Sequence, residues 1–153
     1  MPTLTVTNNE NIVINGRQQG SSKTMTFPDI VDVFTRVFSF KQGTVTTLYS
    51  THNDTVSAGV FDDGSIKYAR ITSLGAEPLI VEVNSEGDLN KLYELQQGQS
   101  YYLYSHTLST FAEASAIDTA DYTALVDIDS VKAYCPRGAG RVEVFVASTE
   151  ASK

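Results

Sequence analysis

Short stretches in which apolar and polar residues alternate recur along the chain, and turn residues separate them. Clear examples are residues 31–40, 66–73, 127–134 and 141–147. Alternation with a period of two puts successive side chains on opposite faces of a β-strand. About nine or ten such stretches without a long helical pattern predict an all-β chain, folded as a single jelly-roll-like β-sandwich domain. The expected core includes Phe34, Phe38, Ile71, Val81, Leu103, Val144 and Val146.

The composition divides the chain into an N-terminal segment (residues 1–22), a sandwich domain (23–148) and a polar tail (149–153). The first segment is mostly polar around one apolar patch, which the turn signal Asn15-Gly16 closes. We therefore expect a short strand with flexible flanks. Such a strand suits pairing with the sheet edge of a neighbour, so residues 1–22 are a candidate oligomerisation arm.

Three stretches have weaker patterns. Residues 89–95 fit a helix or a strand, and a strand is favoured because a turn and a Tyr-rich strand follow. Residues 106–126 are irregular, with one helical turn expected at residues 111–116. The alternation of residues 127–134 slips by one position between Ile128 and Val131, which predicts a β-bulge.

The stretch of residues 31–40 is apolar on both faces. One face carries Val31, Val33, Thr35 and Val37, and the other carries Phe34, Phe38 and Phe40. A two-layer sandwich buries one face of each strand, so we expect a second copy to cover the other face. The alternative is that residues 106–126 of the same chain cover it. The candidate contacts with a partner are Leu4, Val6, Ile12, Val13, Ile14, Phe34, Phe38 and Phe40.

Charge and cysteine usage narrow the functional classes. The net charge of −7 and the pI of about 4.7 disfavour direct binding to nucleic acid. No apolar run approaches the roughly 20 residues that span a bilayer, and the first residues lack a signal-peptide pattern, so we expect no membrane contact and synthesis in the cytoplasm. A single cysteine, Cys135, excludes an intramolecular disulfide and fits a reducing compartment.

The residue types that usually carry catalysis or bind metals form no recognisable pattern. His52 and His106 lie in polar surroundings without the spacing of a catalytic or zinc motif. Residues 62–64 lack the further ligands of a calcium loop and predict a hairpin turn. The acidic stretch of residues 94–129 has no Lys or Arg, which favours an acidic face, solvated or matched to a basic neighbour, over a carboxylate pair for glycoside cleavage. We expect a non-enzymatic protein without a cofactor or metal.

Several strand and turn motifs occur in an order that can be compared with known proteins. Residues 67–74 read Lys-Tyr-Ala-Arg-Ile-Thr-Ser-Leu, residues 93–103 place a Gly-Gln-Ser turn between Tyr- and Leu-containing strands, and residues 142–148 read Val-Glu-Val-Phe-Val-Ala-Ser. In this series the chain resembles small β-rich virion structural proteins of tailed bacteriophages, especially marine ones. It departs from them at Ser73, where they tend to have Asn, and in residues 106–127.

The resemblance implies a structural component of the virion. The position that it favours is that of a capsid decoration protein, which stabilises the shell. A tail, connector or fibre-associated protein is the other position that it allows. The implied partners are further copies of the chain, with a trimer favoured by analogy with phage surface proteins, and virion proteins such as the major capsid protein. The expected location is the virion, after synthesis in the cytoplasm of the bacterial host.

A carbohydrate- or receptor-binding β-sandwich module is the alternative from a different class of protein. The Tyr-rich stretch of residues 100–104 supplies aromatic rings, which sugar-binding sites use as platforms. The candidate sugar contacts are Tyr101, Tyr102 and Tyr104. The number of copies in purified particles would separate a decoration protein from a module at a fibre tip.

Overall fold

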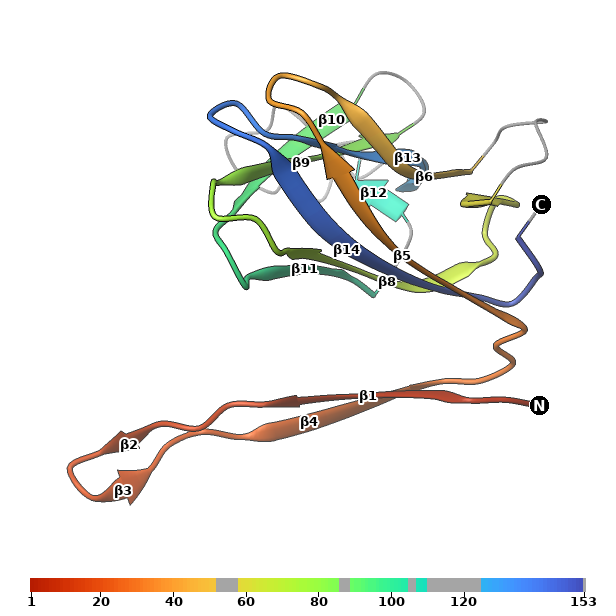
Figure 1. The fold of residues 1–153 in the computed structure, drawn as a ribbon. Helices are drawn as coiled ribbons and strands as arrows, with labels where there is room; N and C mark the ends of the chain where they lie inside the picture. Colours follow the sequence, from red (N-terminus) through yellow and green to blue (C-terminus); the bar gives the residue numbers. More distant parts are fainter. Residues whose placement is uncertain (52–57, 86–88, 105–106, 110–124, 153) are drawn as a thin grey trace, which may run out of the picture.

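A computed structural model describes residues 1–51, 58–85, 89–104, 107–109 and 125–152, and the regular secondary structure of these residues is entirely β-strand (Figure 1). A six-stranded and a four-stranded sheet pack face to face, and four further strands form a long hairpin. The all-β sandwich predicted from the alternating pattern is therefore confirmed. None of the described residues forms a helix with the length and apolar character of a membrane span.

One layer of the sandwich is the six-stranded sheet. It consists of β6 (Thr46–Thr51), β7 (Val60–Phe61), β9 (Leu79–Ser85), β10 (Leu89–Leu95), β12 (Thr107–Ser109) and β13 (Leu125–Tyr134). The strand order is β10-β9-β13-β6-β7, and β12 pairs with β13 outside this path. The pairs are antiparallel except for β6 with β7, which is parallel.

The second layer is the four-stranded sheet. It consists of β5 (Asp32–Phe40), β8 (Ile66–Ser73), β11 (Ser100–Leu103) and β14 (Gly140–Ser148). The strand order is β11-β8-β14-β5, and all three pairs are antiparallel. In this order β5 and β11 are the edge strands.

The inward-facing residues of the two sheets meet in one apolar core. In β14, Val142, Val144 and Val146 have no exposed surface, whereas the residues between them are partly exposed. Burying each such side chain contributes about 1.5–3 kcal/mol. Of the predicted core residues, five are buried and two, Phe34 and Phe38, are half-buried and pack against the core. The five buried residues are Ile71, Val81, Leu103, Val144 and Val146.

The structure settles two of the three weaker sequence patterns. Residues 89–95 form β10, antiparallel to β9, which confirms the strand interpretation. The pairing of β13 with β9 shifts register between Ile128 and Ser130, which confirms the predicted bulge. The helical turn expected at residues 111–116 lies outside the described residues.

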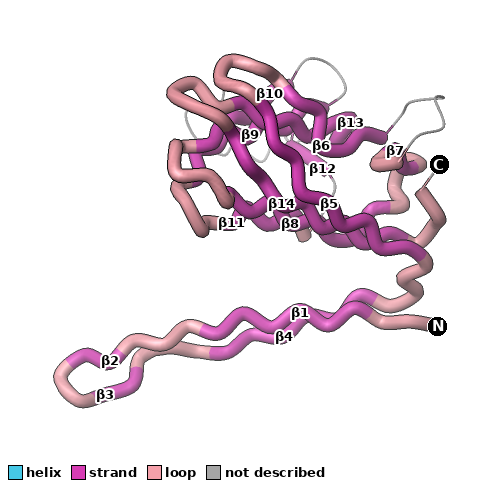
Figure 2. The backbone as a smooth tube through the Cα atoms, in the orientation of Figure 1, coloured by secondary structure: helices cyan, strands magenta, loops and turns pink. Residues whose placement is uncertain are grey.

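A β-hairpin at the N-terminal end of the chain runs along the four-stranded sheet and beyond it (Figures 1 and 2). Its strands are β1 (Leu4–Asn9), β2 (Val13–Ile14), β3 (Arg17–Gln18) and β4 (Ser22–Phe27). β1 pairs with β4 and β2 pairs with β3 in one continuous register. The turn residues Asn15 and Gly16 have φ angles of 52° and 74°, as the favoured two-residue hairpin turn requires.

We call this hairpin, residues 4–27, the arm. It differs from the expected single strand with flexible flanks, because both flanks of the apolar patch are themselves paired strands. It also extends past the boundary expected at residue 22. The alternation of β4 fits a strand of the sandwich equally well, but its hydrogen-bonding partner is β1. The arm therefore ends at Phe27, and the sandwich begins after it.

Candidate functional site

The base of the arm packs against the outer face of the four-stranded sheet. The contact is a small apolar cluster separate from the main core, made of buried Ile30, Tyr68 and Ala147 with Leu4, Val6, Phe27 and Phe145 packed around them. The ring centroids of Phe27 and Tyr68 are 5.7 Å apart. Asn8 Nδ2 donates a hydrogen bond of 2.7 Å to the hydroxyl of Tyr104. These contacts hold the arm at its base.

The tip of the arm, residues 12–18, carries exposed aliphatic side chains. Ile12, Val13 and Ile14 expose 51%, 63% and 50% of their surface. A two-stranded ribbon without a further packing layer is marginally stable in water. The arm tip therefore exposes apolar surface at Ile12, Val13 and Ile14, three of the positions that the sequence predicted as partner contacts.

The aromatic face of β5 is turned toward the core. Phe34, Phe38 and Phe40 are half-buried and pack against the core, and the rings of Phe34 and Phe61 meet edge to face at 6.1 Å. The phenylalanine rings lie inside because they bury more apolar surface than valine side chains do. The predicted partner contacts Phe34, Phe38 and Phe40 are therefore packed against the core of their own chain, as predicted for Phe34 and Phe38 in the core list.

The outward face of the same segment carries Val31, Val33 and Val37, which we call the valine stripe. These side chains expose 60%, 49% and 45% of their surface. Apolar residues on both faces of this segment were expected to require a covering neighbour. The apolar face of this segment that the structure leaves exposed is the valine stripe.

The three tyrosines predicted as sugar contacts do not share a surface. Tyr101 packs against the core and stacks on Tyr93 with ring centroids 4.2 Å apart. Burial raises the pKa of the Tyr101 hydroxyl, and a hydrogen bond with Tyr93 raises it further. Tyr102 and Tyr104 expose 39% and 38% of their surface, and their rings are parallel within 4° at 6.0 Å. Tyr101 and Tyr102 separate because adjacent residues of a strand face opposite sides.

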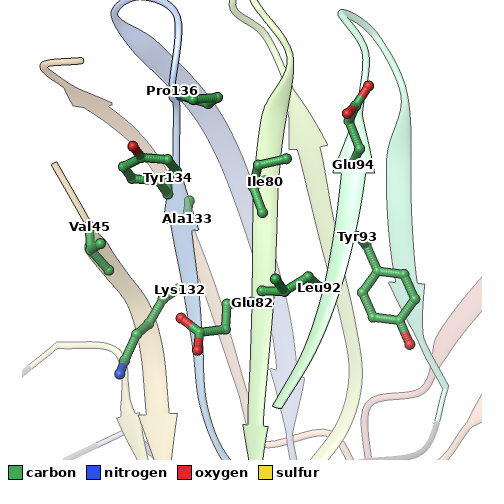
Figure 3. A pocket seen from close by; sticks show the side chains of 10 residues that line it. All are labelled: Val45, Ile80, Glu82, Leu92, Tyr93, Glu94, Lys132, Ala133, Tyr134 and Pro136. Carbon is green, nitrogen blue, oxygen red and sulfur yellow. The ribbon is translucent and has the colours of Figure 1, made fainter. Parts of the chain in front are cut away.

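The outer face of the six-stranded sheet carries an apolar groove of about 650 Å³, which the sequence patterns did not predict (Figure 3). It crosses β10, β9 and β13, and Figure 3 shows Ile80 on the central strand β9. Leu92 and Val45, on either side, expose 67% and 58% of their surface. The apolar lining consists of Val45, Ile80, Leu92, Ala133, Tyr134 and Pro136.

Charged side chains stand at the rim of the groove. Glu82 on β9 and Lys132 on β13 both bond to the side-chain amide of Asn84. With the amide oriented so that its nitrogen and oxygen both have partners, the nitrogen donates to Glu82 Oε1 at 2.9 Å and the oxygen accepts from Lys132 Nζ at 3.1 Å. Glu94 on β10 accepts a hydrogen bond of 2.6 Å from Gln96. The charges of Glu82 and Lys132 offset each other, so Glu94 gives the rim a net negative charge.

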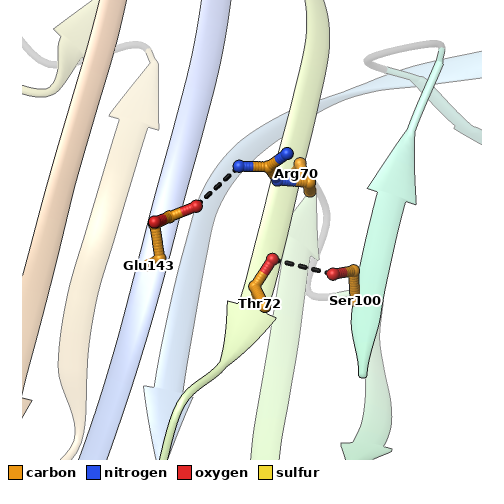
Figure 4. Close-up of polar contacts among 4 residues, drawn as sticks. All are labelled: Arg70, Thr72, Ser100 and Glu143. Atoms are coloured by element: carbon orange, nitrogen blue, oxygen red, sulfur yellow. Dashed lines mark hydrogen bonds and ion pairs between the residues drawn. The ribbon is translucent and has the colours of Figure 1, made fainter. Parts of the chain in front are cut away.

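Polar pairs occupy the outer face of the four-stranded sheet (Figure 4). Arg70 on β8 and Glu143 on β14 form an ion pair of 2.6 Å, and the hydroxyls of Thr72 and Ser100 lie 2.7 Å apart. The Arg70 guanidinium also lies over the ring of Phe145 at 5.7 Å. These cross-strand contacts join β8 to both of its neighbours and make this face more polar than the groove.

No three His, Cys, Asp or Glu side chains gather into a metal-binding group in the part of the chain that the structure describes. Cys135 is buried, and its thiol donates to a backbone carbonyl at 3.4 Å. Residues 62–64 form the predicted turn, in which Gly64 has a φ of 73°. His52 and His106 lie outside the described residues. The surfaces described above are therefore the candidates for function.

The fold defines the chain as an all-β sandwich with a projecting hairpin arm. No family model matches it, and no curated protein matches it either. Among solved structures, the chain is similar to Pseudomonas aeruginosa AlgX, with 14% identity and a TM-score of 0.41 over 76% of this chain. The match covers 26% of the AlgX chain, and a likeness at this level carries no functional argument.

Proposed function

We propose that this chain is a structural, non-enzymatic component of a tailed-bacteriophage virion, most favourably a capsid decoration protein. The observation that carries the proposal is the arm, an ordered hairpin that ends in exposed aliphatic side chains. Apolar surface rimmed by polar residues marks a site of protein–protein contact. The motifs that resemble phage virion proteins supply β8, β10, β11 and β14, which build the body that holds the arm.

The proposed partners are further copies of the chain and the major capsid protein. The arm tip and the valine stripe both leave apolar side chains exposed, and a second copy supplies matching surface in a symmetric assembly. A trimer is the favoured state, by analogy with phage surface proteins. A net charge of −7 disfavours contact with the packaged DNA. The proposed location is the virion, after synthesis in the host cytoplasm.

Mass spectrometry of purified particles of the encoding phage tests this proposal. Hundreds of copies per particle would support capsid decoration, and a handful would support a tail, connector or fibre position. Host lysate without phage, carried through the same purification, is the control for contamination. Absence of the chain from the particles would refute the virion proposal.

A carbohydrate-binding module is the second candidate, and the parallel, exposed rings of Tyr102 and Tyr104 favour it. Flat aromatic faces of this kind can stack on a sugar ring. Binding of the wild-type protein and of Tyr102→Ala to a panel of glycans tests it, with Leu92→Ala on the opposite sheet as the control. Binding that only Tyr102→Ala loses would support this function. No bound glycan would contradict it.

A further inference from the structure

The groove on the six-stranded sheet leaves aliphatic side chains in contact with solvent. Leu92 and Val45 are among the most exposed apolar residues of the sandwich, and Ile80 is partly exposed between them. The remaining apolar lining makes this surface continuous across three strands. Apolar surface rimmed by polar residues is typical of binding sites, so the groove is a candidate surface for a partner.

The arm tip of the same chain lies on the other side of the sandwich. The base of the arm is held against the outer face of the four-stranded sheet, where Phe27 contacts Tyr68 and Asn8 bonds to Tyr104. Figure 1 shows the arm below β8 and β11, away from β9 and β10. The outer faces of a two-layer sandwich point in opposite directions, so an arm tip that enters the groove comes from a second copy.

One face of the arm tip matches the groove in apolar character and in charge. Ile14 pairs with Arg17 across the ribbon, and Ile12 lies two residues before Ile14, so these three side chains share a face. The isoleucines match the apolar floor, and the cation of Arg17 matches the negative rim at Glu94.

We propose that the arm tip of one copy binds in the groove of a second copy, with Ile12 and Ile14 on the floor and Arg17 beside Glu94. The contact joins two different surfaces, so it is head-to-tail and closes into a ring when the rotation between copies allows closure. This inference rests on the assembly role proposed above for the arm and names the surface that receives it. It does not depend on the position of the protein in the virion.

Disulfide trapping tests the contact directly. The variants Ile14→Cys and Leu92→Cys are purified separately in reduced form, mixed and oxidised. Native Cys135 is buried, so the introduced thiols are the ones that react. We expect a covalent dimer on a non-reducing gel and a peptide that links positions 14 and 92 by mass spectrometry. A disulfide requires Cα atoms within about 7 Å, so this product reports direct contact.

The matched control is Ile14→Cys mixed with Val37→Cys, which places the second thiol on the valine stripe. Linkage to position 37 in place of position 92 would overturn the proposal in favour of the valine stripe. A mixture with Leu92→Cys that gives no more dimer than either variant alone would also overturn it.

Charge reversal gives a second, independent test. Arg17→Glu and Glu94→Arg each bring like charges together, and each is expected to raise the Kd for self-association at least tenfold in a light-scattering dilution series. The double variant R17E/E94R restores opposite charges in every contact and is expected to recover wild-type association. Lys41→Glu, at an exposed turn, makes the same change in net charge as Arg17→Glu and serves as the control.

Thermal unfolding by circular dichroism shows whether each charge variant is folded. Folded single variants that associate like the wild type would overturn the proposal, and so would a double variant that stays as weak as the singles. These tests use the purified chain, so their outcome is separate from that of the particle analysis. If the chain is present in virions but the tip does not contact the groove, only this inference is refuted. If the contact forms but the chain is absent from virions, only the virion proposal is refuted.

Discussion

Replacing Phe27 with Ala will release the arm while the sandwich stays folded. Phe27 is half-buried and belongs to the small cluster around Tyr68, apart from the main core. Truncation of a fully buried Phe costs about 3–5 kcal/mol, so a half-buried ring at this site contributes about 2 kcal/mol. That loss falls on the docking of the arm, and it lowers the ratio of docked to free arm roughly 30-fold.

Hydrogen exchange with mass spectrometry measures this release strand by strand. Amides of β1 and β4 are expected to exchange up to roughly 30-fold faster in Phe27→Ala, whereas those of β8 and β14 keep their wild-type rates. Thr26→Ala is the matched control, because Thr26 is exposed in the same strand, next to Phe27 and on its opposite face. Equal loss of protection in the arm and in the sandwich would refute the reasoning, since the two would then unfold as one unit. Unchanged exchange in the arm would refute it as well.

Three further predictions concern stability. Ile71 has no exposed surface, so Ile71→Ala is expected to lower the free energy of unfolding in urea by about 2–5 kcal/mol, and a smaller loss would place Ile71 outside the core. A Cβ at Gly140 would lie 2.2 Å from the ring of Phe40, so Gly140→Ala is expected to cost about 1–3 kcal/mol in the same assay; wild-type stability would contradict the close approach. The backbone N–H of Ser152 donates to Asp32 at 2.8 Å and holds the pKa of that carboxyl below its usual value. The folded-state pKa is then below the unfolded-state pKa, so the stabilisation is complete above about pH 4 and is lost as the pH falls through the folded-state pKa. Thermal melts should therefore show Asp32→Asn less stable than wild type at neutral pH, with the difference shrinking in acid; a constant difference would contradict the assignment.

Strands with one apolar face were predictable from the sequence, whereas β5, with two apolar faces, could not be oriented. In β14 the valines alternate with partly exposed residues, and burial follows the alternation. In β5 a period of two separates the phenylalanines from the valines but does not say which set lies inside. The size of the rings and their contact with Phe61, which is far away in the sequence, decide the orientation.

In the arm, adjacent residues predicted the turn but not the pairing of the strands. Asn15-Gly16 is a local signal, and it correctly predicted the turn. The partner of β4 could not be predicted, because a regular strand fits a sheet edge and a hairpin equally well. The boundary expected at residue 22 followed a change in composition, whereas hydrogen bonding extends the hairpin to Phe27.

The groove could not be predicted because several distant segments build it. Ile80 lies in an uninterrupted apolar run, so alternation does not mark it as outward-facing. The pairing of β13 with β9 and β6 brings Tyr134 and Val45 to the same face. The one local signal is Leu92, an apolar residue between Lys91 and Tyr93 on a strand that also fits a helix, and it becomes informative only when β10 is known to be a strand.

In the proposed assembly, the direction of the arm decides how head-to-tail contacts close. The continuous register from β1 to the Asn15-Gly16 turn puts Ile12 and Ile14 on the same face of the ribbon in every copy. The cluster at the base fixes the angle at which the arm leaves the sandwich. When this angle is the same in every copy, each contact rotates the next copy by the same amount, and a rotation that closes gives rings with a single number of copies. A loosened base lets the angle vary and yields open chains or mixed rings. The base of the arm therefore contributes to the rotation that sets the number of copies, while the arm tip and the groove set how tightly the copies bind.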